Sequence, residues 1–172
     1  MSATESAPHP RSPLAILHDY SVRGGAPRVG ERTAPAADAA WSGMVCQLGD
    51  ERAIVPVAEV AEVIDMPRVT RVPGTASWYL GLGSLRGRVL PLNDLRGYLH
   101  GHPSAASSLR RVLVHGTDTD GVGFVVDDLL GLHAVSAPPG ATCDYQGQTL
   151  AVLSLAEIAT QPRFQRVDLE SI

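Results

Sequence analysis

The stretch GLGSLRGRVLPLNDLRGYL, residues 81–99, combines the glycines of a phosphate-binding loop with the arginines of an anion site. A dinucleotide loop requires the spacing G-x-G-x-x-G followed by the N-terminus of a helix. Here the spacing is G-x-G-x-x-x-G, and the residues that follow have the apolar alternation of a strand. Glycine permits positive φ, and Pro91 cannot donate to a strand ladder. The stretch therefore predicts a turn between two strands, with Pro91 at an edge or a bulge.

Part of this stretch is repeated later in the chain. GRVLPLNDLRGY, from Gly87, and GQTLAVLSLAEI, from Gly147, share the pattern G-x-x-L-x-[LV]-x-x-L-x-x-[YI]. The first two apolar positions of the pattern are two residues apart, as one face of a strand requires. The third apolar position, Leu95 or Leu155, falls in the helical turn that follows. A weaker similarity links VPVAEVAEV (55–63) with FVVDDLLGL (124–132). The two similarities in the same order predict two β units built on one plan, with chance resemblance of short strands as the alternative.

From Trp41 onward, short apolar runs alternate with Gly, Pro and Asp. They predict strands near residues 43–48, 52–57, 61–66, 82–86, 88–93, 110–115, 121–127, 130–135 and 147–153. Helical turns are expected at 57–60, 75–80, 94–99 and 154–160. Asp120-Gly121 is expected to form a hairpin turn. A chain of many short strands is typical of a β-barrel or sandwich rather than of a wound α/β sheet.

Residues 1–40 differ in composition from the rest of the chain. They hold five of the 13 prolines, and their four Arg balance four acidic residues. This composition predicts a disordered tail, followed by a folded domain over 41–172. Within the tail, Leu14, Leu17 and Tyr20 form either one stripe of a short helix or an apolar loop segment. The first residues lack a signal-peptide pattern, and no apolar run approaches the ~20 residues that span a bilayer, so we expect a cytoplasmic protein without membrane insertion.

Charge and composition argue against nucleic-acid binding. The chain has 14 basic and 18 acidic residues, a net charge of −4, and 5% aromatic residues. Nucleic-acid binding calls for a basic face or stacking rings. Every basic residue is Arg, which suits carboxylate recognition at interfaces. The two cysteines, Cys46 and Cys143, have no metal or redox spacing and are expected to be buried thiols.

No group of residues predicts catalysis, a metal or a cofactor. The serines lack a G-x-S-x-G elbow, and TDTDGVG lacks the later Glu of a calcium loop. His100 and His102 lie in a Gly/Pro loop without further ligands, and hydrogen-bonded structural roles are expected for His115 and His133. The adjacent Asp127 and Asp128 are either a coupled carboxylate pair or a solvated strand end, and we expect the latter.

What remains is a binding surface centred on Arg86. This residue lies in a glycine-flanked corner, where a rigid scaffold can present a guanidinium to a partner. The residues alone also allow a local ion pair, for which Asp94 is the candidate acceptor.

Several motifs resemble the CheW family of bacterial chemotaxis coupling proteins. The family steps V-x-E-[IV], V-T-R-[IV], G-[VL]-x-x-L-R-G and V-x-P-[IL]-x-D-L correspond here to VAEV (60–63), VTRV (69–72), GLGSLRG (81–87) and VLPLNDL (89–95). VGFVVDDLLGL (122–132) matches the signature of the family's second half. The pair Trp78-Tyr79 and the Pro/Ala-rich extension are similar to the PilI branch, which serves type IV pilus twitching motility.

The resemblance implies two packed five-stranded SH3-like β-barrels with short helices. It implies a non-enzymatic adaptor without a cofactor, which is cytoplasmic and recruited to membrane receptor arrays. Its partners would be the regulatory domain of a CheA-type histidine kinase and the cytoplasmic tip of a methyl-accepting receptor. By this resemblance the receptor contacts are Val60, Gly81 and Arg86, and the kinase contacts are Glu62 and Val69. Ser84 replaces the Asn that is common before L-R-G, which leaves the receptor pairing open.

Other functions compete with this one. A small-ligand or nucleotide-binding β-barrel would use residues 81–87 and would be stabilised by its ligand. A β-barrel for single-stranded nucleic acid disagrees with the acidic charge and the few aromatic residues. Within the family, a protein that binds only the kinase or only the receptor would uncouple them.

Overall fold

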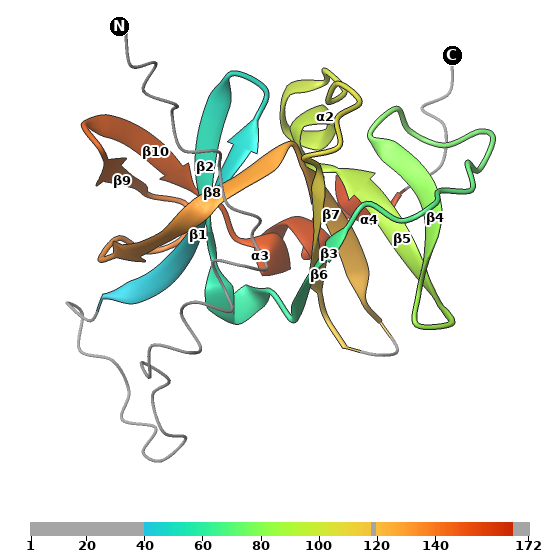
Figure 1. Cartoon of the computed structure of the whole chain (residues 1–172), viewed down its shortest axis with the longest axis horizontal. Helices are drawn as coiled ribbons and strands as arrows, with labels where there is room; N and C mark the ends of the chain where they lie inside the picture. Colours follow the sequence, from blue (N-terminus) through green and yellow to red (C-terminus); the bar gives the residue numbers. More distant parts are fainter. Residues whose placement is uncertain (1–39, 118–119, 167–172) are drawn as a thin grey trace, which may run out of the picture.

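The computed structural model describes residues 40–117 and 120–166, which form ten strands in two five-stranded sheets (Figure 1). The first sheet has the order β8-β1-β2-β10-β9 and contains β1 (Trp41–Leu48), β2 (Glu51–Pro56), β8 (Asp128–Val135), β9 (Thr142–Tyr145) and β10 (Gln148–Val152). The second has the order β3-β6-β7-β5-β4 and contains β3 (Glu62–Asp65), β4 (Tyr79–Leu85), β5 (Arg88–Asp94), β6 (Arg111–His115) and β7 (Val122–Val126). The helical segments are the 3-10 helix η1 (Val57–Glu59), α2 (Leu95–His100), α3 (Leu155–Thr160) and α4 (Pro162–Gln165). The prediction of a mainly β chain with two five-stranded units is confirmed.

Each sheet is assembled from both halves of the chain. β1 and β2 lie in the first sheet, and the chain then crosses through η1, so that β3, β4 and β5 lie in the second. The second half does the reverse, with β6 and β7 in the second sheet and β8, β9 and β10 in the first. Both crossings leave a parallel pair in the receiving sheet, β10 with β2 and β5 with β7, whereas the neighbours joined by hairpins are antiparallel.

The register of the parallel pairs confirms the sequence repeat. Leu92 of β5 pairs with Gly123 of β7, and Val152 of β10 pairs with Ile54 of β2. Leu92 and Val152 are equivalent in the repeat, and each is followed by a one-turn to two-turn helix. The two similar β units that the repeat predicts are therefore present. Each half of the chain places its last three strands in the sheet that contains the first two strands of the other half.

The two equivalent hairpins turn in the same way. Arg86 and Gly87 join β4 to β5 with φ angles of 51° and 80°, and Gln146 and Gly147 join β9 to β10 with 53° and 77°. Positive φ at both central residues is the requirement of a two-residue type I′ turn, which matches the twist of the flanking strands. The prediction of a turn between two strands is confirmed, but the turn is only Arg86-Gly87, and residues 81–85 belong to β4.

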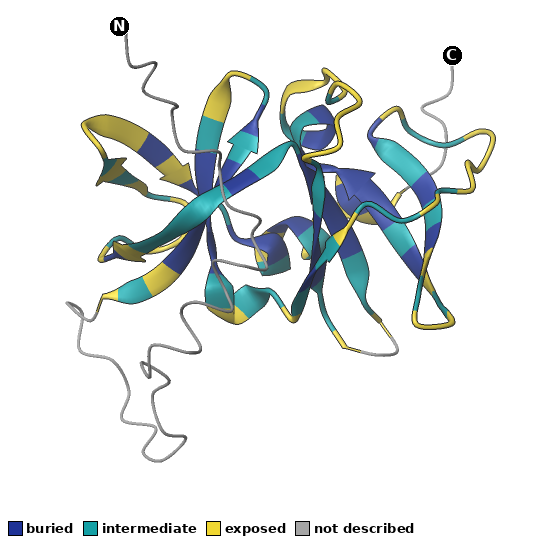
Figure 2. Cartoon of the chain, in the orientation of Figure 1, coloured by how far each residue is buried: buried dark blue, intermediate teal, exposed yellow. Residues whose placement is uncertain are grey.

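An aromatic cluster fills the space between the sheets and the C-terminal helices. Phe164 of α4 stacks on Trp78 and Phe124, with ring centroids 5.4 and 5.2 Å apart, and Tyr98 of α2 meets Trp78 edge-on at 5.1 Å. Figure 2 shows buried residues in the central parts of the strands and exposed residues at the outer turns. The apolar cluster around these rings draws residues from both sheets, so the two sheets pack on a shared core, and each sheet also has a smaller apolar cluster of its own.

Asp94 is a buried carboxylate that organises the end of β5. Its side chain is fully buried, and it caps α2 by accepting a 3.0 Å hydrogen bond from the amide of Gly97. It also accepts from the amide and the hydroxyl of Ser104, at 2.7 and 2.9 Å. Since an unpaired buried carboxylate is costly, these bonds hold the loop after α2 against the strand end.

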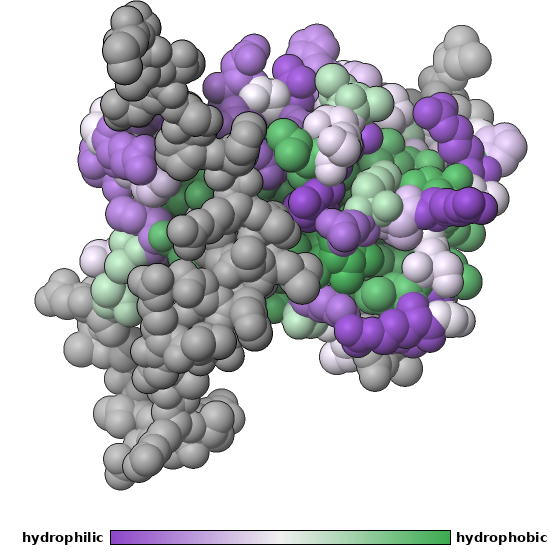
Figure 3. Space-filling model, viewed as in Figure 1, coloured by the Kyte–Doolittle hydropathy of each residue, from purple (hydrophilic) through white to green (hydrophobic). Residues whose placement is uncertain are grey.

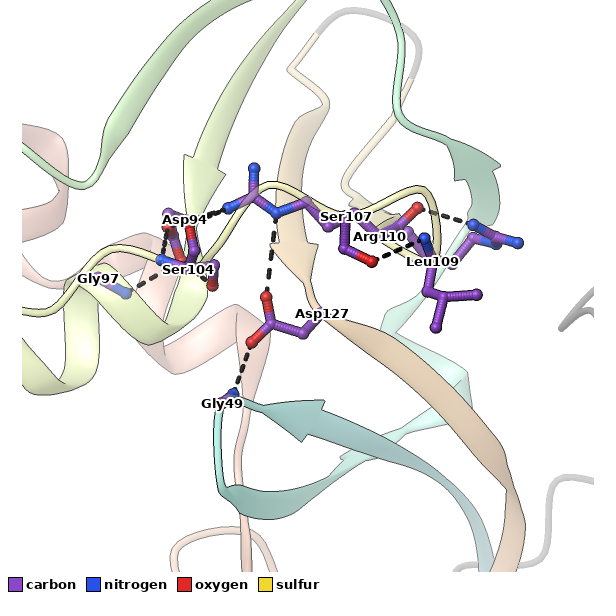
Figure 4. Close-up of polar contacts among 9 residues, drawn as sticks. Gly49, Asp94, Gly97, Ser104, Ser107, Leu109, Arg110 and Asp127 are labelled. Atoms are coloured by element: carbon purple, nitrogen blue, oxygen red, sulfur yellow. Dashed lines mark hydrogen bonds and ion pairs between the residues drawn. The ribbon is translucent and has the colours of Figure 1, made fainter. Parts of the chain in front are cut away.

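Arg110 extends this network from the second sheet to the first (Figure 4). Its Nη2 lies 3.7 Å from Asp94, and its Nε lies 3.9 Å from Asp127. Asp127 accepts a 2.5 Å hydrogen bond from the amide of Gly49, in the turn between β1 and β2. The expectation that Asp127 is a solvated strand end is therefore wrong, because this carboxylate ties the two sheets together.

Two further element predictions differ from the structure. Residues 75–80 were expected to be helical, but β4 starts at Tyr79 and the carbonyl of Trp78 accepts from the Asp94 amide at 2.7 Å. Pairing with β5 outweighs the local preference. β9 (Thr142–Tyr145) was not predicted. Residues 1–39 of the predicted tail, with Leu14, Leu17 and Tyr20, lie outside the described residues, so the tail stays a prediction.

Replacing Arg110 should destabilise the fold more than replacing its neighbour Arg111. Both side chains are 12% exposed, but Arg110 faces the buried Asp94, whereas Arg111 lies 3.3 Å from Asp65, which is 82% exposed. Leaving a buried carboxylate without its cation costs about 3 kcal/mol or more, while an exposed partner returns to water at a cost of about 1 kcal/mol or less. Chemical denaturation of Arg110→Ala and Arg111→Ala measures the difference. Equal losses of stability would contradict the role of the network.

Candidate partner-binding surface

The five residues predicted to contact partners all lie in the second sheet or in the segments directly before and after β3. Val60 follows η1, Glu62 begins β3, Val69 follows β3, Gly81 lies in β4, and Arg86 is at the tip of the β4–β5 hairpin. β3 and β4 are the two edges of this sheet. The edges meet because Thr70 and Leu82 exchange two backbone hydrogen bonds of 2.8 and 2.9 Å, which closes the sheet.

Glu62 and Arg86 form an ion pair across this seam. Arg86 Nη2 lies 2.5 Å from Glu62 Oε1, and the two side chains are 70% and 28% exposed. The structure thus corrects the sequence-based candidate Asp94, which is buried at the other end of β5. It also brings together a residue predicted for the receptor and a residue predicted for the kinase. The αL backbone of Arg86, set by the type I′ turn, holds the guanidinium at the rim of the sheet.

Gly81 and Gly83 let the chain after β3 lie close against β4. A Cβ on Gly81 would be 2.2 Å from the carbonyl oxygen of Thr70, and one on Gly83 would be 2.9 Å from the ring of Pro67. Gly81 also has a φ of 126° at a register shift in β4. Gly81 is buried, and its close approach to Thr70 fixes the position of the neighbouring backbone.

The two valines present only part of their side chains. Val60 is half-buried against the core shared by the sheets, and its neighbour Ala61 donates to Val114 in β6 at 2.8 Å. Val69 is half-buried against a second apolar cluster, which includes Ile64 and Met66. Figure 3 shows hydrophobic atoms gathered on the face where β3 and β5 lie, bordered by hydrophilic ones. An apolar centre with a charged rim is the usual anatomy of a protein–protein contact.

The repeat provides an internal comparison for this surface. Glu62 pairs with Val114 of β6, and its equivalent in the first sheet, Gly131, pairs with Val45 of β1. The equivalent of Arg86 is Gln146. The turn geometry and strand register are common to both sheets, whereas the charged pair occurs only at the Glu62–Arg86 position. The fold therefore does not require the ion pair.

Two of the histidines that the sequence singled out have structural partners. His115 Nδ1 lies 2.7 Å from the Glu59 carbonyl oxygen, and His133 Nε2 lies 3.2 Å from the Asp144 carbonyl oxygen, as expected of structural histidines. Burial raises the pKa of Cys46 to about 12, while Cys143 is only half-buried, unlike its expectation. In 40–117 and 120–166, no three His, Cys, Asp or Glu side chains are placed to hold a metal ion. No helix in these ranges is long and apolar enough to cross a membrane.

The carboxylate of Glu59 joins the crossover to the C-terminal helices. It accepts from the Ser154 hydroxyl at 3.0 and 3.1 Å and from the Ala156 amide at 3.0 Å, while Ser154 caps α3. Glu59 was not singled out in the sequence analysis. Two features of the sequence could have indicated this role. Glu59 lies just before the chain passes from the first sheet to the second, and Ser154 aligns in the repeat with Asp94, the residue that caps α2.

Two five-stranded β units that exchange strands, with a charged pair on one edge, define the structural class of this protein. Residues 42–159 match the CheW-like domain family, and the chain belongs to that family. It is 34% identical over 122 residues to protein PilI of Pseudomonas aeruginosa, an alignment that covers 71% of this chain and 68% of PilI. It is 33% identical over 82 residues to chemotaxis protein CheW of Helicobacter pylori, covering 48% and 50% of the two chains.

A solved structure has the same fold. The scaffolding protein TtCheW from Thermoanaerobacter tengcongensis superimposes with a TM-score of 0.60, covering 68% of this chain and 90% of that one. The two are 18% identical, so this likeness supports the architecture alone. The family resemblance inferred from the motifs is confirmed.

Gly81→Ala should be far more destabilising than Gly87→Ala. Both glycines have positive φ, but a Cβ on Gly87 meets nothing within 4 Å, whereas one on Gly81 meets backbone atoms of Thr70 and Arg71. Strained φ alone costs about 1–2 kcal/mol, and displacement of the chain that closes the sheet should raise the cost for Gly81 to roughly 3 kcal/mol or more. Thermal unfolding of both variants measures this. Similar losses would contradict a packing role for Gly81.

Proposed function

We propose that this chain is a non-enzymatic adaptor that couples methyl-accepting receptors to a CheA-type histidine kinase, in chemotaxis or type IV pilus signalling. The observation that carries the proposal is the exposed Glu62–Arg86 pair, which one sheet has and its equivalent lacks. The CheW-like family consists of scaffold adaptors, which supports a coupling role. Similarity to PilI and to a chemotaxis protein supports this choice of pathways. The working unit would be residues 41–172.

The receptor side is assigned to Val60, Gly81 and Arg86. Arg86 supplies an exposed guanidinium on a turn of fixed backbone, suited to a carboxylate or a carbonyl at the receptor's cytoplasmic tip. Val60 supplies apolar area, and Gly81 places the neighbouring backbone. Through this contact the chain would be recruited to membrane receptor arrays without entering the bilayer.

The kinase side is assigned to Glu62 and Val69. Val69 and its apolar neighbours would form the centre of the contact with the kinase's regulatory domain, with Glu62 at the rim. Rim charges of this kind set orientation and partner choice more than total affinity.

The ion pair gives these two sides a physical connection. A receptor group that engages Arg86 competes with Glu62 for the same guanidinium, so receptor binding frees the Glu62 carboxylate for the kinase. By linkage, kinase binding at Glu62 then favours receptor binding by the same factor.

Charge substitutions at this pair test the assignment. Arg86→Ala should leave the melting temperature nearly unchanged, because the side chain is 70% exposed. It should weaken receptor binding by roughly 1–3 kcal/mol and leave kinase binding equal or tighter. Glu62→Arg should weaken kinase binding by roughly 1–3 kcal/mol. Calorimetric titration with a receptor cytoplasmic fragment and with the kinase regulatory domain separates the two effects.

The double variant Glu62→Arg/Arg86→Glu is the matched control. It can rebuild the ion pair within the chain, but it presents the opposite charges to both partners. The proposal therefore expects the double variant to remain defective for both. Recovery of normal affinity would show that the pair acts only inside the chain, and the assigned contacts would then be wrong.

A further inference from the structure

A groove of about 700 Å³ lies on the second sheet, between two loops. One wall is the loop 71–77 before β4, and the other is the loop 103–106 after α2. The volume falls within the range of pockets that enclose a specific ligand. None of the five residues assigned to the receptor and the kinase lines this groove, so the proposed function makes no use of it.

Both walls are held in place by hydrogen bonds of their own. In the wall after α2, Ser104 donates its amide and its hydroxyl to Asp94 at 2.7 and 2.9 Å, and its carbonyl accepts from Arg110 at 2.7 Å. In the wall before β4, the Thr75 hydroxyl donates to the Val72 carbonyl at 2.9 Å. These bonds make the groove a preformed feature of the fold, as binding pockets usually are.

The first sheet lacks the long connection that forms the wall before β4. Residues 66–78 join β3 to β4, whereas the shorter segment 136–141 joins the equivalent strands β8 and β9. Leu80, which lines the groove, has no partner in the register of β4 with β5, where the pairing shifts between Tyr79 and Gly81. Bulges of this kind redirect a side chain and are frequent beside functional sites. Because the fold common to both sheets requires neither feature, they indicate a role in binding.

The accessible charge of the groove is positive. Arg71 is exposed and makes no hydrogen bond or ion pair with the described residues. Arg110 also lines the groove, and Figure 4 shows one of its guanidinium nitrogens pointing away from both Asp94 and Asp127. The one carboxylate of the lining belongs to Asp94, which is fully buried and already accepts three hydrogen bonds. A carboxylate is therefore the complementary ligand for the two arginines.

Apolar surface and a strand edge lie beside these arginines. Val72 is one of three exposed large apolar residues in the described ranges, and it lines the groove together with Leu80. Leu80 belongs to β4, an edge strand of the second sheet, and edge strands accept extended peptides alongside them. We propose that the groove binds an extended acidic segment of another protein. A carboxylate of this segment pairs with Arg71 and the outward nitrogen of Arg110, and a neighbouring apolar side chain packs on Val72 and Leu80.

Peptide binding by the full chain tests the proposal. In fluorescence anisotropy, a labelled (Glu-Val)₃ peptide should bind about tenfold more tightly than a labelled (Gln-Val)₃ peptide, because only the first can pair with the arginines. Arg71→Glu should weaken this binding about tenfold, and Val72→Ser about threefold through lost apolar contact. Arg68→Glu is the matched control, since Arg68 is exposed but does not line the groove, and it should leave binding unchanged. Equal losses from the Arg71 and Arg68 variants, or no binding of the acidic peptide, would overturn the proposal.

Hydrogen exchange locates the bound peptide. Saturating (Glu-Val)₃ should slow amide exchange in 71–77 and 103–106 and leave β9 and β10 unaffected. The Arg86→Ala chain should show the same protection, so a failure of the receptor assignment and a failure of this inference are distinguishable. Protection confined to other segments would place the peptide outside the groove and overturn the assigned site. Displacement of the peptide by an equal concentration of free glutamate would show a site for small carboxylates and overturn the peptide as its occupant.

Discussion

The exchange of strands between the two repeats is the constraint on which the rest of the structure depends. Neither repeat can complete a sheet by itself, because β3 to β5 of one and β8 to β10 of the other are placed in the opposite sheet. The parallel pairs β2/β10 and β7/β5 carry contacts between residues far apart in the chain. The shared aromatic cluster and the Arg110 network add side-chain contacts between the same units. Folding of both sheets should accordingly be one cooperative event.

The internal repeat also separates what the fold needs from what the surface adds. The Gly87 and Gly147 turns, the apolar positions of β5 and β10, and a helix cap after each strand occur in both units. The Glu62–Arg86 pair occurs only in the second sheet, as do Gly81 and Gly83, which leave space for residues 67–71 to pack against β4. Because the equivalent positions of the other sheet lack these features, the shared fold does not account for them. Partner binding is the cause that the exposed pair and its apolar surroundings support best.

Sequence reasoning succeeded where the signal was local or repeated. The hairpin at 81–99 and its second copy followed from glycine position and apolar spacing, and the repeat anticipated two like units. It failed where the cause was tertiary. The helix expected at 75–80 gave way to pairing with β5, and the partner of Arg86 was taken from nearby Asp94 because the seam between β3 and β4 is not visible in the sequence. β9 could have been found by aligning Tyr145-Gln146-Gly147 with Leu85-Arg86-Gly87.

The central claim is that one chain holds two partners on adjoining parts of one sheet. Sedimentation velocity of a receptor cytoplasmic fragment and the kinase regulatory domain, with and without this chain, tests it most directly. The account predicts a single faster-sedimenting species containing all three proteins only when the chain is present. Separate binary complexes, with each partner displacing the other, would contradict it and identify a protein that engages one partner at a time.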